Sequence, residues 1–255
     1  MRKNAILKHA ITTAILGGSI LSSSASWAAS CFANSAGNWS TVAWSGTGCA
    51  SGPAAADHTT ISATSISLNG VPINVGSVTV SFGGALDDAG ATGSSITTGY
   101  ILLGGGSAGF TQNTPITITG DNPSSSQGAL DYYGGAAKSF ATNGNLSFTG
   151  TGQIIGVPTG QSLNIVGTSG TPVQLSTTNT VDLQGAGTYT INYVYFAAGT
   201  WTDNTTGTFN ISNCTVAGGA TVPAGWGCTA PSSPTSASVN LLPSNKPIWF
   251  AKDLE

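Results

Sequence analysis

Apolar and polar residues alternate with a period of two along most of the chain between about residues 57 and 229. β-Branched residues are common in these short segments, and each segment ends at Gly, Asn, Ser or Pro, as is typical of strands closed by turns. No helical periodicity separates them, so the pattern predicts an all-β protein. Representative segments are Ser77–Phe82, Pro115–Thr119, Leu163–Val166 and Thr208–Ile211.

Two all-β architectures fit this pattern. In a β-sandwich of antiparallel hairpins, many strands would present a charged, solvated face, whereas the polar positions here are almost all Ser, Thr and Asn. A parallel β-solenoid suits such residues better, because its stacked coils bury small apolar side chains and display polar ladders outside. We therefore expect a β-solenoid of roughly seven to nine coils, with a β-sandwich as the alternative.

Composition narrows the class of protein further. Of 255 residues only 6% are charged, 40% are hydrophobic, and the formal net charge is −3. A typical soluble domain is about a quarter charged, and proteins that bind nucleic acid carry a basic patch that this composition does not provide. We expect no nucleic acid among the partners, and the β-branched and aromatic content excludes a charge-driven disordered chain.

The first residues predict export. Three basic residues precede an apolar run over residues 10–21, and Ser26-Trp27-Ala28 places small residues at the two positions that a signal peptidase reads. The run is shorter than the roughly 20 residues that span a bilayer. We predict a signal peptide over residues 1–28, no membrane span after its removal, and a secreted, extracellular or cell-surface location in a bacterium. Beyond residue 28 the chain has one histidine, His58, and no arginine, which removes most acid–base chemistry.

All four cysteines follow the predicted cleavage site. An even number in an exported chain suggests disulfides, and three pairings are possible. Pairing of near neighbours would place one disulfide at each end of the β-region. None of the spacings is a short C-x-x-C, and His58 is the only imidazole left, so no metal site is expected. The cysteines are Cys31, Cys49, Cys214 and Cys228.

A stretch near the N-terminus carries a family resemblance. Gly37-Asn38-Trp39 is followed by Trp44, then by an Ala-rich turn, and then by Asp57-His58-Thr59-Thr60-Ile61. This order resembles the N-terminal module of bacterial secreted β-helix surface proteins, including adhesins and proteins similar to MSHA pilus biogenesis proteins. The resemblance covers about sixty residues. It implies a right-handed parallel β-helix on an exported surface protein and carries no catalytic motif.

The two tryptophans of this stretch suit a cap. The first coil of a solenoid exposes an unpaired edge and an apolar interior, which would invite aggregation. Trp39 and Trp44 are large enough to cover that end, and a Cys31–Cys49 disulfide would fix the cover; sugar binding is their alternative role. We expect a cap over residues 29–56 and a solenoid body over residues 57–229 that begins at Asp57, with Trp226 covering the other end.

After the body, the composition changes. Pro231–Ser236 predict a linker, and residues 230–255 as a whole form a linker and an apolar tail. Such a tail is not expected to stay free in water. It either folds back on the solenoid or adds a strand to a neighbouring subunit. Its large apolar residues are Leu241, Leu242, Ile248, Trp249 and Phe250.

No catalytic constellation stands out. Gly104–Gly109 matches G-x-G-x-x-G, but no helix follows it to bind phosphate, and His58 has no G-x-S-x-G partner. The β-helix polysaccharide enzymes need converging carboxylates, and the one candidate group is Asp131 with Lys138 and Tyr132-Tyr133. Asp87-Asp88 predicts a solvated turn, with a weak calcium site as the alternative. We expect no catalytic residue, no cofactor and no metal.

A binding role is the main alternative to a structural one. Tyr189, Tyr193 and Tyr195 alternate with other residues on one predicted strand, so they share one face, with Trp201 nearby. Facing outward they would make an aromatic platform for sugar rings, and facing inward they would fill the core.

Taken together, the sequence predicts an exported non-catalytic structural protein of the cell surface or extracellular matrix: an adhesin, a matrix protein or a self-assembling filament subunit. The expected partners are copies of itself or components of the surface and matrix. A carbohydrate-binding module that binds glycans is the alternative, and a polysaccharide-degrading enzyme is less favoured.

Overall fold

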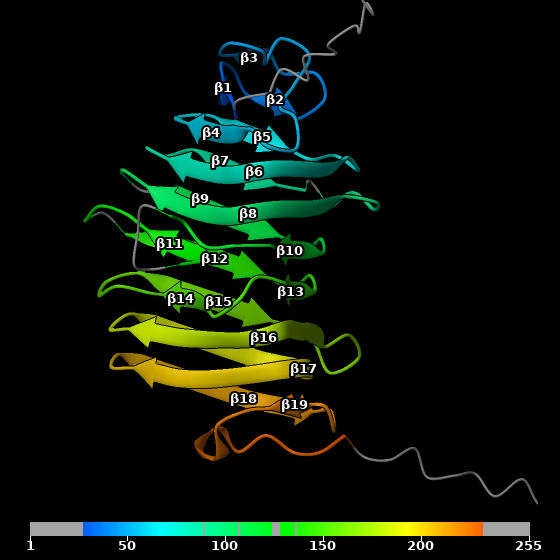
Figure 1. Cartoon of the computed structure of the whole chain (residues 1–255), viewed down its shortest axis with the longest axis vertical. Coiled ribbons are helices and arrows are strands. Elements are labelled where there is room, and N and C mark those ends of the chain that lie inside the picture. The colour runs from blue at the N-terminus through cyan, green and yellow to red at the C-terminus, as the bar shows by residue number, and fades with distance from the viewer. Residues whose placement is uncertain (1–27, 89, 107, 124–127, 136, 232–255) are drawn as a thin grey trace, which may run out of the picture.

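The computed structural model describes residues 28–231 apart from 89, 107, 124–127 and 136. Within them the chain winds into a β-solenoid of about seven stacked coils that runs from the blue to the orange end of Figure 1. The strands of successive coils pair in parallel, and the one antiparallel strand pair among the described residues joins β1 to β3 at the N-terminal end. The predicted β-solenoid is therefore confirmed, and the β-sandwich alternative is wrong.

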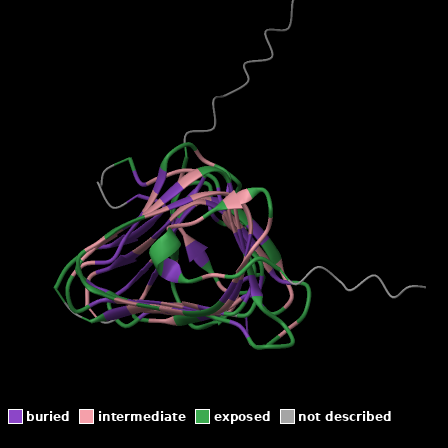
Figure 2. Cartoon of the chain, turned by 90° about the horizontal axis from the view of Figure 1, so that it is seen from below, coloured by how far each residue is buried: buried purple, intermediate pink, exposed green. Residues whose placement is uncertain are grey.

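Each coil adds strands to three β-faces, which enclose a three-sided core (Figure 2). Face A contains β4 (His58–Ser62), the second halves of β6 (Pro72–Ser81), β8 (Ser95–Gly104) and β16 (Val173–Gly185), β11 (Leu130–Tyr132), β14 (Gln153–Gly156) and the end of β17 (Thr188–Thr205). Face B contains β5 (Ser65–Ser67), β7 (Ala85–Asp87), β9 (Ala108–Gln112), β12 (Lys138–Thr142), β15 (Ser162–Val166) and the first residues of β17 and of β18 (Thr208–Val216).

Face C completes each coil between faces B and A. It contains the first halves of β6, β8 and β16, the middle of β17, the end of β18, and two short strands, β10 (Ile116–Ile118) and β13 (Leu146–Phe148). On all three faces most inward residues are apolar and most outward residues are polar, which is the period-two pattern of the sequence.

The core is a column of apolar side chains that repeats from coil to coil. Phe110 and Phe140 stack at a ring-centroid distance of 4.9 Å, and both are fully buried. Burial of one such side chain contributes about 1.5–3 kcal/mol to folding. The stacked coils therefore draw their stability from many small, equivalent contributions along the axis.

Single residues with a left-handed backbone make several corners. Ala63 (φ 54°) and Phe82 (φ 49°) follow a paired position and lead from face A to face B in successive coils. Tyr193 (φ 50°) and Asn213 (φ 48°) do the same between faces B and C. One left-handed residue reverses the in–out alternation, so the apolar positions on both sides of a corner point inward.

The coils differ in length, which explains why no fixed repeat is visible in the sequence. One coil advances 19 residues from His58 to Ser77, another 30 from Gly109 to Ser139, and another 20 from Thr188 to Thr208. The register between paired strands shifts within the β16–β17 pair, between Leu175 and Thr180.

The two ends of the chain fall outside this description. Residues 1–27 of the predicted signal peptide lie outside the described residues, as does the segment 232–255 with Leu241, Leu242, Ile248, Trp249 and Phe250. Within residues 28–231 no helix has the length and hydropathy needed to cross a bilayer.

Candidate functional site

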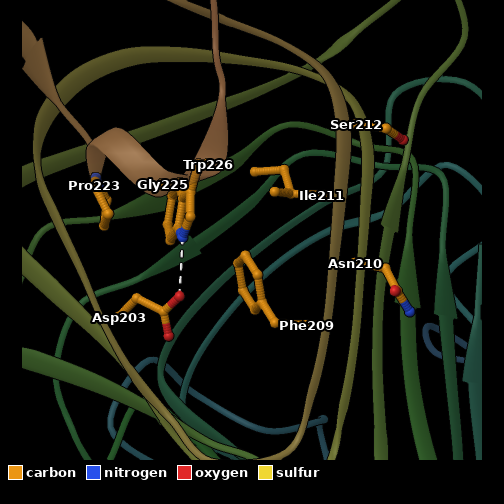
Figure 3. A pocket seen from close by; sticks show the side chains of 8 residues that line it. All are labelled: Asp203, Phe209, Asn210, Ile211, Ser212, Pro223, Gly225 and Trp226. Carbon is orange, nitrogen blue, oxygen red and sulfur yellow. Dashed lines mark hydrogen bonds between the residues drawn. The ribbon is translucent and has the colours of Figure 1, made fainter.

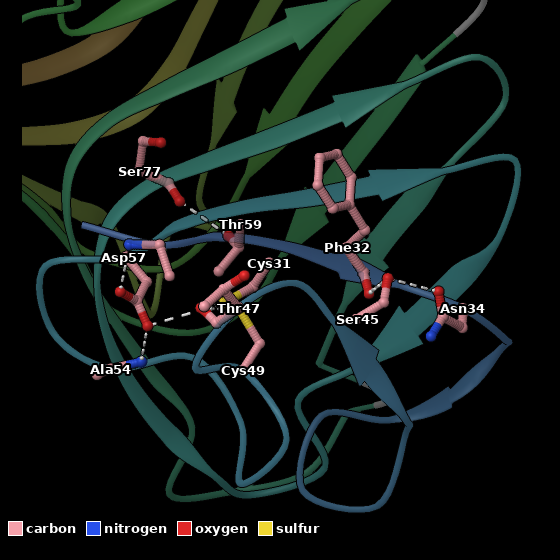
Figure 4. The surroundings of a disulfide bond; sticks show 11 residues. Cys31, Phe32, Asn34, Ser45, Thr47, Cys49, Ala54, Asp57, Thr59 and Ser77 are labelled. Carbon is pink, nitrogen blue, oxygen red and sulfur yellow. Dashed lines mark hydrogen bonds between the residues drawn. A yellow bond between two sulfur atoms is a disulfide. The ribbon is translucent and has the colours of Figure 1, made fainter. Parts of the chain in front are cut away.

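The N-terminal end of the solenoid is closed by backbone pairing. β1 (Ser30–Ala33) pairs in parallel with β4, and β3 (Trp44–Ser45) lies antiparallel on β1, while β2 (Gly37–Asn38) covers β5 on face B. The disulfide Cys31–Cys49 joins this layer to its loop, and both cysteines are fully buried (Figure 4). The antiparallel strand ends the parallel stack at this side.

A buried carboxylate completes the N-terminal end. The Asp57 side chain accepts hydrogen bonds from the backbone N–H groups of Ala29 at 2.8 Å and Ala54 at 2.7 Å (Figure 4). One ligand atom each of Asp57, Cys31 and Cys49 lie within 4.8 Å of one another, as in a metal site. The two sulfur atoms are bonded to each other, however, so no thiolate is left to bind a metal ion. Asp57 therefore fixes the entry to the first coil.

Trp39 and Trp44 cover the interior at this end. Their ring centroids are 4.7 Å apart, the Trp44 Nε1–H donates to the Trp39 carbonyl at 3.2 Å, and each side chain is only 7% exposed. A hollow of about 430 Å³ lies beside them. This burial is what a cover requires, and it leaves little ring surface for the alternative role of stacking on a sugar.

The C-terminal end is covered by a different device. A short 3-10 helix, η1 (Ala224–Trp226), places the Trp226 ring on Phe209 at 5.2 Å and near Phe196 at 5.4 Å. The Trp226 Nε1–H donates to Asp203 Oδ2 at 3.0 Å (Figure 3). The disulfide Cys214–Cys228 anchors the segment that follows, as the near-neighbour pairing of the cysteines predicts.

A pocket of about 740 Å³ remains between η1 and β18. Phe209 and Ile211 point into it from β18 (Figure 3) and are half-buried, whereas Tyr189 and Ile191, one coil away, are buried. In the described part of the chain, Thr208–Ser212 pair with β17 on one side and with nothing on the other. The residues that line the pocket are Asp203, Phe209, Asn210, Ile211, Ser212, Pro223, Gly225 and Trp226.

The tyrosines do not form the outward platform that was one of their two predicted alternatives. Tyr189 is fully buried, and its hydroxyl donates to the Ile155 carbonyl at 3.0 Å and accepts from the Val157 N–H at 3.2 Å. Burial raises the pKa of Tyr189 well above its ordinary value, and hydrogen bonds from the backbone oppose that shift only in part.

The tyrosines do not share one face because of one corner residue. Tyr193 has a left-handed backbone (φ 50°), so the alternation shifts there, and Tyr195 lies on the outer side of face C opposite Gln174. Trp201 is 2% exposed and packs on Phe196 inside the solenoid. The prediction that the three tyrosines share one face with Trp201 nearby is therefore wrong.

The carboxylates of the body hold the structure together. Asp182 accepts from the Thr202 hydroxyl at 2.8 Å and from the Asn204 amide at 2.8 Å, across two strands of face A. Asp88 accepts from the backbone N–H groups of Gly90 at 3.1 Å and Asn113 at 3.0 Å, which ties two coils at a turn. Asp87 ends β7, and Asp88 stands at the turn that follows but is only 3% exposed. The predicted turn is therefore present, but its description as solvated is wrong for Asp88.

Asp131 and Lys138 are both buried, but the contacts described for them are separate. Asp131 accepts from the Asn122 amide at 2.8 Å, and the Lys138 ammonium donates to the Gly134 carbonyl at 2.9 Å. Burial lowers the pKa of Lys138, and burial raises the pKa of Asp121, whose backbone hydrogen bond from Ile154 acts in the opposite direction. The hydrogen bonds described for Asp131 and Lys138 thus go to different partners, a side-chain amide and a backbone carbonyl.

The structure also brings together residues that sequence reasoning did not connect. His58 Nδ1 lies 2.8 Å from the hydroxyl of Ser77, one coil away. Ser77 is 1% exposed, and the Asp57 carboxylate is committed to Ala29 and Ala54, so no described carboxylate orients the imidazole as a catalytic triad requires. No local signal in the sequence predicts a contact across 19 residues.

The sequence pattern also does not predict that two aromatic side chains are largely exposed. Phe82 is 65% and Tyr133 72% exposed, and both follow face A at the corner to face B. Gly105 lies between them with φ +64°, and a Cβ there would stand 2.8 Å from the Phe82 ring. Close packing against Phe82 explains a glycine of the Gly104–Gly109 run.

Comparison of the whole chain with protein-family models, curated proteins and solved structures found no match.

Proposed function

We propose that this chain is an exported, non-catalytic structural protein of the cell surface or extracellular matrix that acts as an adhesin or matrix component. The observation that supports it best is an unbroken polar ladder on the outside of face C. One small hydrogen-bonding side chain from each of five successive coils lies in register. The ladder consists of Asn74, Thr97, Thr117, Ser147 and Ser176.

Such a ladder suits a repetitive partner. Adjacent strands lie about 4.8 Å apart, so face C repeats the same chemistry at that interval on a backbone that does not need to be ordered on binding. The Ser176 hydroxyl lies 3.1 Å from that of Ser147, which further aligns the groups. Contacts that are weak one by one add up along a polymer or a surface with a matching repeat.

Faces A and B offer less regular surfaces. The outward column of face A contains Leu102 and the buried Asp131, and that of face B contains Ala141 and Asp87. Face C is therefore the surface that we assign to the partner.

The closed N-terminal end favours an adhesin or matrix role over a filament built by stacking solenoids end to end. A parallel stack would need an open strand edge at both ends, and β3 ends the parallel pairing at one of them. Contacts along the sides of the solenoid remain available.

The disulfides indicate an oxidising, extracellular compartment. The predicted signal peptide and the resemblance to the capping module of bacterial surface proteins support export from a bacterium.

Substitution on face C tests the proposal. The full chain is added to bacterial cells and to isolated matrix, and the retained fraction is compared with that of Thr117→Lys/Ser147→Lys. The matched control is Asn164→Lys/Thr190→Lys, which adds the same two charges on adjacent coils of face B. We expect at least a tenfold loss of retention for the face C variant and none for the control. Equal retention of all three proteins would refute the assignment.

Carbohydrate binding is a second candidate, favoured by Phe82 and Tyr133. Both rings are more than half exposed, although Gly105 packs on Phe82, so ring surface is available for stacking on sugar rings. Phe82→Ala and Tyr133→Ala should each abolish retention on a glycan array, whereas Phe32→Ala, at a 46% exposed ring near the cap, should not. Retention that survives both substitutions excludes this site.

A further inference from the structure

The two disulfides differ in the space around their sulfur atoms. Cys31 and Cys49 are fully buried, and a Cβ at Gly46 would stand 3.0 Å from Cys49 Sγ, so backbone leaves little room beside that sulfur. At the other end of the solenoid Cys228 is only half-buried. A Cβ at Gly227 would meet none of the described residues within 4 Å apart from its chain neighbours. A small molecule therefore reaches Cys228 more easily than either N-terminal cysteine.

The two disulfides also differ in the charge beside them. Asp57 Oδ2 lies 3.7 Å from Cys31 Sγ, and two backbone N–H groups hold this carboxylate in place (Figure 4). Among the described residues, Cys31–Cys49 is the one disulfide that forms such a cluster with a carboxylate. Cys214 Sγ instead lies 3.9 Å from the backbone carbonyl of Trp226. A thiolate formed at Cys31 would thus be opposed by a like charge, whereas one formed at Cys214 would meet a neutral group.

We propose that Cys228 is a site of thiol–disulfide exchange with low-molecular-weight thiols, and that opening of the Cys214–Cys228 disulfide releases the C-terminal cap, residues 215–229, while Cys31–Cys49 stays closed. The inference is independent of the proposed function, because it concerns one end of the solenoid and not the outer side of face C. It makes the C-terminal end sensitive to thiols and leaves the N-terminal end resistant to them.

The exchange needs no reactant besides the external thiol. Its thiolate attacks Cys228 Sγ, the S–S bond breaks, and the Cys214 sulfur leaves with the electron pair and takes up a proton. A second external thiolate attacks the external sulfur of this mixed disulfide, and the Cys228 sulfur leaves in the same way. Two external thiols are oxidised to one disulfide, and the Cys214–Cys228 disulfide is reduced to two thiols. At Cys31 the leaving sulfur would develop its charge beside Asp57, which slows the corresponding step.

The disulfide is a main attachment of the C-terminal cap to β18. Thr229 also pairs with the end of β18, since its N–H donates to the Cys214 carbonyl at 3.0 Å and its carbonyl accepts from the Val216 N–H at 2.9 Å. This bridge is isolated, and β19 (Ala220–Thr221) adds only two paired residues on β17. Without the cross-link, pairings as short as these should open locally far more often.

Timed alkylation of the full chain in glutathione tests the exchange site. Free thiols are alkylated at intervals, and the peptides that contain each cysteine are quantified by mass spectrometry. In the folded protein we expect Cys214–Cys228 to open at least tenfold faster than Cys31–Cys49, with glutathione attached to Cys228 at early times. In concentrated urea the two disulfides should open at rates within about threefold of each other, because burial and the nearby carboxylate no longer distinguish them.

Hydrogen exchange at the amides of Val216 and Thr229 measures release of the cap. In the unaltered protein, glutathione should speed both at least tenfold once Cys214–Cys228 has opened. In Cys214→Ala/Cys228→Ala both amides should exchange fast before glutathione is added and should not respond to it. Amides in the paired part of β17 report in the same experiment whether the chain is folded.

The matched control is Cys31→Ala/Cys49→Ala, in which Val216 and Thr229 should respond to glutathione as they do in the unaltered protein. Equal opening rates in the folded protein, faster opening of Cys31–Cys49, or a tenfold difference that persists in urea would overturn the exchange site. Slow exchange at both amides after Cys214–Cys228 has opened would show that the disulfide does not hold the cap, and would overturn its release.

Discussion

The two ends of the solenoid use the same three ingredients with different results. Each end has a disulfide, a buried tryptophan and a carboxylate that accepts hydrogen bonds. At the N-terminal end the last parallel strand also receives an antiparallel partner, β3. At the C-terminal end, within residues 28–231, Trp226 covers the core while Thr208–Ser212 keep one unpaired edge. Covering apolar side chains is thus not enough to close a β-solenoid, because its backbone groups must be paired as well.

The exposure of the two sets of residues reflects this difference. Cys31 and Cys49 are fully buried and Asp57 is 4% exposed, whereas Asp203 at the other end is exposed. The N-terminal end is therefore expected to contribute more to stability than its counterpart.

The largest effect is expected at the tryptophans. Replacing a buried Trp by Ala costs about 3–5 kcal/mol, and Trp44→Ala should fall near the top of that range because its ring and its N–H are both satisfied inside the cap. Trp226→Ala should cost about 2 kcal/mol, since its Nε1–H bonds to the exposed Asp203 and the pocket beside its ring is larger than the hollow beside Trp44. Urea unfolding of the two variants measures the difference, and equal losses would remove the contrast between the ends.

Removal of a disulfide should give the next largest loss of stability. The two loops are similar, because the paired cysteines are 18 and 14 positions apart in the sequence, so cross-linking restrains the unfolded chain to a similar degree. Cys31→Ala/Cys49→Ala should cost about 3 kcal/mol and Cys214→Ala/Cys228→Ala about 2 kcal/mol. Thermal unfolding of both double variants gives the order, and a larger loss at the C-terminal end contradicts it.

The carboxylates should show a smaller contrast. Asp57→Asn leaves one acceptor oxygen for two backbone N–H groups and should cost about 2 kcal/mol. Asp203→Asn keeps an acceptor for the Trp226 N–H and should cost less than about 1 kcal/mol. Urea unfolding at neutral pH compares the two, with the outward Asn164→Asp as a variant that should be neutral.

The smallest effect is expected from acid, which protonates Asp203 at the C-terminal end and so lowers the unfolding free energy. Burial alone raises the pKa of Asp203, but hydrogen bonds from Trp226 and Thr205 outweigh it and hold the pKa below its usual 3.8. The ionised group therefore stabilises the folded state above pH 3.8, and this contribution is lost as the pH falls through the lowered pKa. Asp203→Asn should flatten the pH dependence of the unfolding free energy in this range.

Asp121 should contribute a pH dependence of the unfolding free energy that has the opposite sign to that of Asp203. Its pKa is raised by burial, so its contribution to stability falls as the pH rises from 3.8 through the higher folded-state pKa. Asp121→Asn should remove a slope of that sign, and slopes of the same sign for both variants would contradict the two hydrogen-bonding environments.

Local patterns were sufficient to predict the class of fold and the location of its ends. Alternation in segments such as Pro115–Thr119 predicts which side chains point inward, since a strand has a period of two wherever it lies. It fails at Phe82, which follows the strand at a left-handed corner and is 65% exposed. Trp39, Trp44 and the neighbouring cysteines indicate a covered end, because large apolar rings can cover the core and a short disulfide loop can hold them there.

Contacts between coils needed the folded chain. Tyr193 reverses the alternation through one left-handed residue, so Tyr189 and Tyr195 face opposite sides although their spacing along the sequence indicates a shared face. The His58–Ser77 contact and the packing of Phe82 on Gly105 join residues about one coil apart, and the coils vary between 19 and 30 residues. Register across such variable steps is set by the stacking of the whole column, so no window of sequence shorter than a coil contains it.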